Sequence, residues 1–361
     1  MADQITNYQC PSCLAPLRFD EQSQQLVCDY CGETFTTAQI EALYAEKDEA
    51  AAEAAQEWDT SELKEEWGED ADGMRVYNCP SCGAQLICDE TTAASSCPYC
   101  GNPTIVPGQL HGALKPDCII PFKLDKDEAV KALKKHYKGK KLLPRAFTDE
   151  NHIEKLQGVY VPFWLFDGTA EANMQFHATR SETHREGSYE VTTTSHFNLQ
   201  RNGTVELRSI PADGSSKMPD ALMDSLEPYN YDDLVPFSNA YLPGFMADKY
   251  DVTAEDCFRR ADARARRTVE DAMAATCVGY DTVTPAGGTS KLNRGGVRYA
   301  LLPVWVLSTH WKDQNFLFAM NGQTGRLIGD LPTDKGQYWK WFFIAGSIVA
   351  AAVMAVSCFL L

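Results

Sequence analysis

The chain has 361 residues, 44% of them hydrophobic, which is enough for two or three domains with cores of their own. It carries 33 basic and 50 acidic side chains, a formal net charge of -17. This balance disfavours nucleic acid as a partner, because the negative surface repels phosphates, and it suits basic protein partners.

The first hundred residues contain a repeated pattern of cysteines. Eight of the thirteen cysteines form four Cys-x-x-Cys pairs, and each copy of the pattern has fourteen residues between its two pairs. Tyr8-Gln-Cys10-Pro-Ser-Cys13 recurs 69 residues later as Tyr77-Asn-Cys79-Pro-Ser-Cys82. Pairs at this spacing are typical of metal sites rather than disulfides, so we expect a reducing compartment. The other five cysteines are expected to be small buried apolar residues: Cys88, Cys118, Cys257, Cys277 and Cys358.

Each copy supplies the four thiolates of a structural zinc site, so we predict two Zn²⁺ ions. The first zinc ribbon, residues 1–35, offers Cys10, Cys13, Cys28 and Cys31, and the second, residues 75–106, offers Cys79, Cys82, Cys97 and Cys100. Glycine follows three of the pairs and suits a left-handed turn, whereas Leu14 follows the first pair. Iron would use similar ligands. Cys97-Pro-Tyr-Cys100 also has the sequence of a glutaredoxin redox pair, but Gly101-Asn-Pro103 disfavours the helix that redox chemistry needs.

Residues 36–74, between the ribbons, are rich in alanine and glutamate. They hold thirteen acidic residues and two lysines, which accounts for 11 of the net negative charges (13 minus 2). Alanine and glutamate favour helix, and large apolar residues such as Trp58 and Trp67 are few. We predict an acidic helical spacer that is solvated and semi-rigid, with a helix that docks on a partner as the alternative.

The region after the second ribbon has the composition of an α+β protein. We predict two related lobes, residues 119–230 and 231–332, each with a helix on an antiparallel sheet. Their relation rests on Val161-Pro-Phe-Trp164, which resembles Leu302-Pro-Val-Trp305. The expected helices are Lys126 to about Lys138, capped by Asp125, and about Thr253 to Thr276. The expected strands are Val159–Phe166, Ala170–Thr179, Tyr189–Leu199, Thr204–Ile210, Tyr299–Thr309 and Asn315–Met320, with Asn202-Gly203 as a hairpin turn.

The C-terminal residues, 338–361, have the pattern of a transmembrane helix. Trp341–Leu361 contains 21 residues without a charge, about 30 Å of helix, which matches the hydrocarbon core of a bilayer. Lys335 and Lys340 precede it, so the positive-inside rule predicts a single-pass protein with its N-terminal bulk in the cytoplasm. Small residues from Gly346 to Ala355 would allow helix–helix association in the membrane.

Basic residues gather at two places against the acidic background. Five arginines lie on the expected helix from Thr253 to Thr276, and acidic residues three or four positions away suggest ion pairs along that helix, such as Asp262 with Arg266. Lys131 to Lys141 holds six lysines with less compensation, which suggests contact with anionic lipid heads. No phosphate-binding loop or hydrolase motif occurs, so we expect a binding protein and not an enzyme.

Four short motifs follow the paired ribbons: Ile120-Pro-Phe-Lys123, Gly158-Val-Tyr-Val-Pro-Phe-Trp164, Asp213-Gly-Ser-Ser-Lys-Met218 and Leu242-Pro-Gly-Phe245. With these motifs, nearly the whole chain resembles a family of bacterial zinc-ribbon membrane proteins associated with phage-shock-protein-A homologues. The resemblance implies a membrane-anchored scaffold that recruits a cytoplasmic coiled-coil protein of membrane stress. Family members are often labelled as replication-restart helicases, and a nucleic-acid-binding ribbon protein is the alternative function. The resemblance carries over no catalytic residues.

Overall fold

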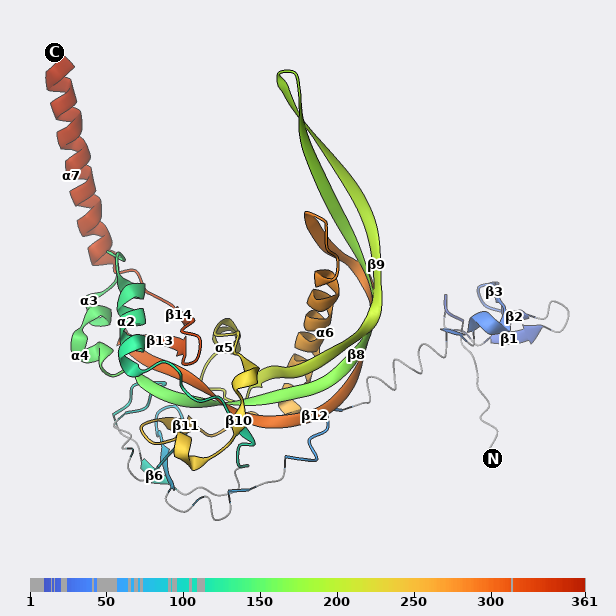
Figure 1. Cartoon of the computed structure of the whole chain (residues 1–361), viewed down its shortest axis with the longest axis horizontal. Helices are drawn as coiled ribbons and strands as arrows, with labels where there is room; N and C mark the ends of the chain where they lie inside the picture. Colours follow the sequence, from blue (N-terminus) through green and yellow to red (C-terminus); the bar gives the residue numbers. More distant parts are fainter. Residues whose placement is uncertain are drawn as a thin grey trace. The chain divides into compact units, whose positions relative to one another are not determined.

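The structure is a computed structural model that describes residues 10–13, 15, 17–20, 25–40, 42–43, 57–63, 66–67, 71, 74–89, 92, 96–103, 106–108, 114–312 and 314–360. The chain divides into two compact units. Unit 1 comprises Met1–Glu57 with Lys291–Asn293, and unit 2 comprises Trp58–Ser290 with Arg294–Leu361. The described elements include both helices and sheets, which confirms the α+β class (Figure 1).

Unit 1 is built on a small antiparallel sheet in the order β1-β2-β3. Its strands are β1 (Leu17–Asp20), β2 (Gln25–Cys28) and β3 (Thr34–Phe35). The β1–β2 hairpin lies between the two cysteine pairs and ends with Leu17 opposite Cys28. After β3 the chain turns into a helix at residue 37, where the Thr36 backbone and side chain exchange hydrogen bonds with Gln39. A β-hairpin therefore joins the two cysteine pairs of unit 1.

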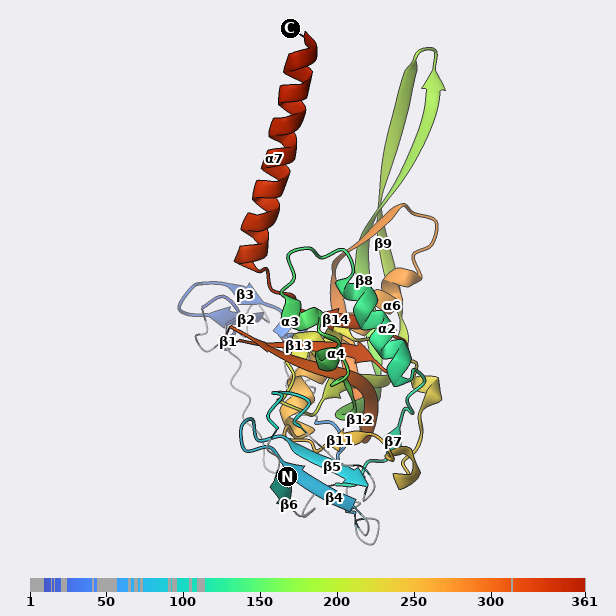
Figure 2. The ribbon, with the colours of Figure 1, turned by 90° about the vertical axis from the view of Figure 1, so that its left-hand side faces the viewer.

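Unit 2 is built on one large mixed sheet, which has eleven strands within the described residues. Its central order is β10-β7-β12-β8-β11-β5-β4-β6, with β9 beside β8, β13 beside β12 and β14 beside β13 (Figures 1 and 2). The strands are β4 (Met74–Asn78), β5 (Gln85–Asp89), β6 (Val106–Gly108), β7 (Cys118–Ile119), β8 (Gln157–Glu186), β9 (Tyr189–Asp213), β10 (Val235–Pro236), β11 (Met246–Asp248), β12 (Thr282–Trp311), β13 (Gln314–Asn321) and β14 (Leu327–Gly329). The helices are α2 (Lys126–Tyr137), α3 (Arg145–Thr148), α4 (Glu150–Ile153), α5 (Asp220–Ser225), α6 (Phe258–Ala275) and α7 (Lys335–Leu360), with 3-10 turns η2 (Tyr231–Asp233), η3 (Asn239–Tyr241) and η4 (Glu255–Cys257).

The two lobes predicted for 119–230 and 231–332 are not separate, because their main strands β8 and β12 are neighbours in this sheet. In addition, the helix of each predicted lobe packs on strands of the other lobe. Helix α2 precedes β8 in the chain but packs through Leu133 against Trp305 and Phe318 of β12 and β13. Helix α6 precedes β12 but packs on β8 and β9, where Phe258 meets Phe166. Each helix covers the strands of the other half, so neither half has a complete core alone.

The expected helices are confirmed in their positions, while the arginine partners are corrected. Helix α2 begins after Asp125, whose side chain accepts from Glu128 N in a capping box, as the sequence predicted. Two of the arginines of α6, Arg260 and Arg264, pair with acidic residues on other elements. Arg260 contacts Asp213 and Asp224, and Arg264 contacts Asp224 at 2.7 Å, because these acids lie on β9 and α5 beside the helix.

The expected strands 159–166 and 170–179 are parts of β8, and 189–199 and 204–210 are parts of β9. The hairpin turn predicted at Asn202-Gly203 is wrong, since Asn202 pairs with Asn173 and Gly203 with Ala172 in mid-ladder. The chain reverses instead after Glu186, at Gly187, which has a positive φ of 62°. Gly203 lies under α6, where an added β-carbon would stand 3.5 Å from Met273 Cε.

The described end of the predicted helical spacer is extended and docked on unit 2. Residues 57–60 and 66–67 are not helical. Asp59 forms a bridge with Gly296, and Trp58 is buried with its Nε1 donating to Asp262 at 3.0 Å. Trp67 is buried too and stacks edge-on against Phe237. The two buried indoles supply enough apolar contact to hold residues 58–60 and 66–67 on the rest of unit 2. The acidic composition of the segment had instead indicated a solvated spacer. Residues 44–56 lie outside the described part.

Helix α7 ends the described chain and extends away from the sheet (Figures 1 and 2). Its first turn is attached to unit 2, because Asp334 N donates to Leu142 O at 2.9 Å and Lys141 Nζ lies 4.2 Å from the Trp341 ring centroid. Within the described part of the chain, no helix combines the length and the apolar composition needed to cross a membrane.

Candidate metal centres

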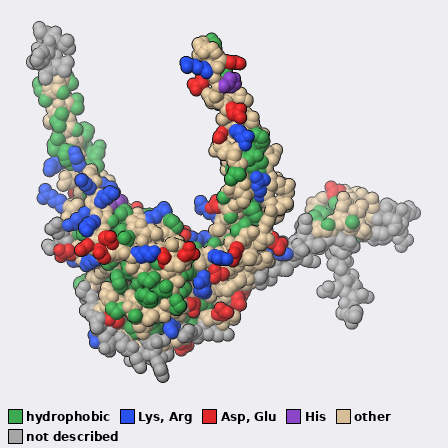
Figure 3. All heavy atoms as spheres, in the orientation of Figure 1, with side chains coloured by type: hydrophobic (Ala, Val, Ile, Leu, Met, Phe, Trp, Pro, Cys, Tyr) green, Lys and Arg blue, Asp and Glu red, His purple; other side chains and the backbone are tan. Residues whose placement is uncertain are grey.

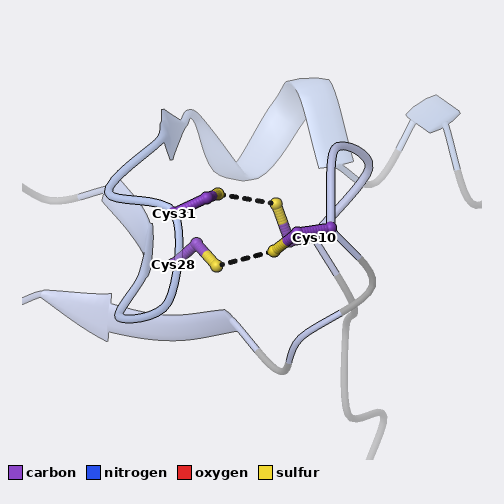
Figure 4. A group of neighbouring side chains, drawn as sticks. Cys10, Cys28 and Cys31 are labelled. Atoms are coloured by element: carbon purple, nitrogen blue, oxygen red, sulfur yellow. Dashed lines mark hydrogen bonds between the residues drawn. The ribbon is translucent and has the colours of Figure 1, made fainter.

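The first centre brings together the four predicted cysteines of unit 1. Cys10 and Cys13 lie in the turn before β1, and Cys28 and Cys31 lie in the turn after β2, so the hairpin brings the two pairs face to face (Figure 4). The sulfur of Cys10 is 3.6 Å from that of Cys31, and the sulfur of Cys13 is 3.4 Å from that of Cys28.

The second centre repeats this arrangement in unit 2 with the other four cysteines. The sulfurs of Cys79 and Cys100 are 3.6 Å apart, and so are those of Cys82 and Cys97. Cys79 and Cys82 lie between β4 and β5 in the chain, whereas the second pair of unit 1 lies at the end of β2 and before β3. In each centre all four sulfurs lie within 4.8 Å of one another.

Both groups fit a metal ion with four sulfur ligands. At a metal–sulfur distance of about 2.3 Å, tetrahedral geometry places the sulfurs about 3.8 Å apart, close to the observed separations. A disulfide would need about 2.05 Å, so neither group is a pair of disulfides. With four protein ligands, the ion would have no open position for substrate, which suits a structural role.

Backbone turns hold the cysteines in place. The glycines after three pairs, Gly32, Gly83 and Gly101, have positive φ angles of 79°, 73° and 72°, and each amide donates to the carbonyl of the first cysteine of its pair. This confirms the left-handed turns expected from the sequence, which glycine adopts without strain. Leu14, which takes this position after the first pair, lies outside the described residues.

The backbone also adjusts the acidity of the thiols. The N–H groups of Cys31 and Tyr30 point at the Cys28 sulfur and lower the pKa of Cys28 to about 7. Burial raises the pKa of Cys79, but the N–H groups of Cys82 and Ser81 outweigh it and hold that pKa at about 7. Thiolates are the form that binds metal, so these N–H groups favour binding at neutral pH.

The second centre belongs to the main core of unit 2. Cys79 and Cys97 are buried among apolar side chains of β5, β8 and β12, including Leu86, Val161 and Leu302. Cys97-Pro-Tyr-Cys100 lies in a turn that continues without a helix through residues 101–103, so the helix N-terminus required by the redox reading is absent from these described residues. Burial also raises the pKa of Cys97, whereas a redox thiol needs it lowered.

Tyr99, in the middle of this turn, joins the second centre to the sheet. Its hydroxyl donates to Asp248 Oδ2 at 2.8 Å, and Asp248 also accepts from Ser215 Oγ at 2.6 Å. The Asn315 amide donates to Tyr99 O at 2.8 Å. All of Tyr99, Asp248 and Ser215 are buried. Sequence reasoning missed this cluster, because its members come from β11, β13 and the segment after β9, which are far apart in the chain.

A groove of about 800 Å³, which no sequence motif predicted, lies beside the second centre. The turn that holds Cys97 and Gly101 forms one wall, and α4 with the end of β12 forms the other. His152 of α4 lies 2.7 Å from Thr309 Oγ1 across its floor. Burial lowers the pKa of His152, which favours the neutral imidazole at pH 7.

The cysteines outside the two centres are inert by burial. Cys88, Cys118 and Cys257 are buried, and burial raises the pKa of each thiol, to about 12 for Cys88 and Cys257 and about 11 for Cys118. Cys277 is also buried. This confirms their reading as small apolar residues, while Cys358 lies beyond the described side chains.

Comparison with known proteins places the chain among uncharacterised relatives. No protein-family model matches it, and no solved structure gives a significant match. The uncharacterized protein YdjG of Bacillus subtilis (strain 168) is 36% identical over 353 residues, which cover 96% of each chain. The chain belongs to the family of this protein.

Proposed function

We propose that this protein is a membrane-anchored scaffold in which two zinc ribbons present binding surfaces to a protein partner. The observation that carries the proposal is the surface of α7, where large apolar side chains are exposed in an aqueous setting. Phe343 and Met354 are 65% and 64% exposed, and the others are Phe342, Ile344, Ile348, Val349 and Val353. A run of this size on a folded protein marks a surface that another apolar phase covers.

The apolar side chains point to all sides of α7. Successive helical residues differ by about 100° around the axis, so Phe342, Phe343 and Ile344 alone cover more than half of the circumference. A helix that is apolar all round is surrounded by protein or by lipid, unlike an amphipathic helix that lies on a surface. The run of 21 uncharged residues from Trp341 to Leu361 continues past the side chains that the structure describes, and for this whole run we assign the bilayer as the surrounding phase.

Zinc is the ion that we assign to both centres. Four thiolates from two Cys-x-x-Cys turns suit zinc, which has no redox chemistry of its own and favours a closed tetrahedral site. In this role the ions would stabilise the ribbons and take no part in catalysis. Iron in the same ligands would be visible by its colour and distinguished by elemental measurement of the purified protein.

The first ribbon favours a protein partner over nucleic acid. Its described surface includes one basic residue, Arg18, which is paired with Asp29 at 3.2 Å, and Ser12 is hydrogen-bonded to Glu33. Phosphate binding needs uncompensated basic groups. A cytoplasmic coiled-coil protein of membrane stress, the partner that the family resemblance implies, is the occupant that we propose for the ribbons.

Affinity purification of the full-length chain from gently solubilised membranes tests the proposal. Proteins that co-purify with the wild type are compared with those from the pair Cys10→Ser and Cys79→Ser, which lacks one ligand in each centre. The matched control is the pair Cys88→Ala and Cys277→Ala, which removes two cysteines outside the centres. We expect a coiled-coil partner with the wild type and the control, and its loss with the ligand pair. Recovery of the chain in the soluble fraction, or the same partners in all three samples, would refute the scaffold.

A further inference from the structure

The exposed face of α2 carries a row of lysines. Lys134 and Lys135 lie three and four residues after Lys131, and Lys138 lies four and three residues after them. Residues at this spacing share one side of a helix, and all four lysines are exposed. The buried residues of the helix, such as Leu133 and Tyr137, lie on the opposite side, against β12 and β13. The packing of α2 therefore fixes which way the lysines point, and we call these four residues the α2 lysine face.

Further basic residues continue this face to the foot of α7. Lys140, Lys141 and Arg145 follow α2 in the chain and are exposed, as are Lys335 and Lys340 in the first turns of α7. Contact between Lys141 and the Trp341 ring, at 4.2 Å, joins the two groups. Figure 3 shows these basic side chains gathered around the lower end of α7, next to its apolar length.

Four acidic residues near this face have backbone hydrogen-bond partners at the ends of elements. Asp125 and Glu128 hydrogen-bond each other's backbone at the N-terminus of α2. Asp149 accepts from His152 N, and Asp334 accepts from Gly336 N at 2.8 Å. The lysines accordingly lie toward the middle and the C-terminal end of α2, away from the acidic first turn.

We propose that the α2 lysine face binds the phosphate groups of anionic phospholipids around the foot of α7. The proposal rests on the membrane anchor proposed above and names the lipid class that meets it. Charge decides the ligand, since a net charge of -17 on the whole chain would be repelled by an anionic bilayer unless a basic surface faced it. The position of the basic residues favours lipid head groups over free phosphate as the source of the phosphate group, because these residues border the segment assigned to the bilayer.

Lipid retention by the full-length chain in a neutral detergent tests this proposal. The protein is incubated with an equimolar mixture of phosphatidylglycerol and phosphatidylcholine and repurified, and the retained lipids are measured by mass spectrometry. The test variant combines Lys131→Gln, Lys135→Gln and Lys138→Gln. The matched control removes three exposed basic residues elsewhere, Arg185, Arg259 and Arg267, each replaced by Gln.

A basic residue at an anionic surface strengthens binding about fivefold, so the loss of three should weaken it by roughly a hundredfold at low salt. We expect the wild type and the arginine control to retain phosphatidylglycerol at several times the input ratio. The lysine variant should fall to the input ratio, and a variant with arginine at the same three positions should regain the preference. In 0.5 M NaCl the preference should disappear, while millimolar inorganic phosphate should leave it unchanged.

A wild-type ratio equal to the input ratio would overturn the lipid proposal, as would a preference that survives in the lysine variant. Release of the lipid by millimolar inorganic phosphate would overturn it as well, because the face would then bind free phosphate. Carbonate extraction of cell membranes separates this failure from that of the anchor. If the wild type stays in the extracted membranes without lipid preference, only the lysine face is refuted. If it is released, the anchor itself fails.

Discussion

Replacement of Asp248 by asparagine should remove a pH dependence of stability that the fold builds into unit 2. Asp248 is fully buried on β11, and burial raises its pKa from 3.8 to about 7. Tyr99 and Ser215 donate to Oδ2, but Oδ1 has no hydrogen-bond partner among the described residues. An ionised carboxylate would leave a buried charge on that oxygen, so the folded protein favours the protonated form.

Proton linkage sets the direction and the size of the change in unfolding free energy with pH. Because the folded pKa is above the unfolded pKa, the folded state binds the proton more tightly between pH 4 and pH 7. Stability is therefore lost as pH rises through this range and levels off above pH 7. For a folded pKa of about 7, the free energy of unfolding should fall by about 1.4 kcal/mol between pH 6 and pH 8 from this group. Asparagine accepts the same two hydrogen bonds and does not titrate.

Urea unfolding of the full-length chain in a neutral detergent, followed by tryptophan fluorescence, measures this effect. Trp164 and Trp305 are buried in unit 2 and report its unfolding. The quantity to compare is the difference in unfolding free energy between Asp248→Asn and the wild type at several pH values, since other titrations are shared by both proteins. We expect this difference to shift by about 1.4 kcal/mol in favour of the variant from pH 6 to pH 8. A difference that stays constant over this range would refute the reasoning.

Substitutions at four further positions test other parts of the structure. Trp58→Ala should weaken the packing of its segment on the rest of unit 2 by about 3 kcal/mol. Tryptic cleavage at Lys64, measured by mass spectrometry, should then become faster, and an unchanged cleavage rate would contradict the docking. Leu133→Ala should lower the free energy of unfolding of unit 2 by about 3 kcal/mol, and Leu133→Met should lower it by less than about 1.5 kcal/mol. Urea unfolding measures both effects, and small effects of equal size would contradict the packing of α2. Cys10→Ser and Cys79→Ser should each lower bound metal from two ions to one by elemental measurement, but only Cys79→Ser should shift the fluorescence transition of unit 2.

The metal ligands were predictable because short-range spacing alone defines them. A Cys-x-x-Cys turn brings two sulfurs together without help from the rest of the fold, and the repeat at 69 residues supplied the partners. The capping residue Asp125 and the glycine turns were predictable for the same reason, since each depends on neighbours within four residues. Local chemistry of this kind leaves a clear pattern in a single sequence.

Features that depend on distant contacts were not predictable. Asn202-Gly203 is a strong hairpin pattern, yet pairing with Asn173 and Ala172 keeps it in a strand, because a long ladder outweighs one local preference. The exchange of α2 and α6 was missed since each helix was assigned to the nearest strands in the chain. Arg260 was likewise assigned partners on its own helix, while its acids lie on β9 and α5.

The two cysteine centres share their ligand spacing but differ in what surrounds them, and this difference suggests separate roles. Tyr99 and its partner Asp248 join the second centre to the sheet, and its cysteines are part of the main core, so loss of its metal would disturb unit 2 as a whole. The first centre is held by a hairpin of its own, and Cys31 is exposed. A partner that binds the first ribbon could therefore contact the metal turn directly without strain in the sheet. On this reasoning, the first ribbon is the main recruiting surface of the two, and the second also stabilises the sheet of unit 2.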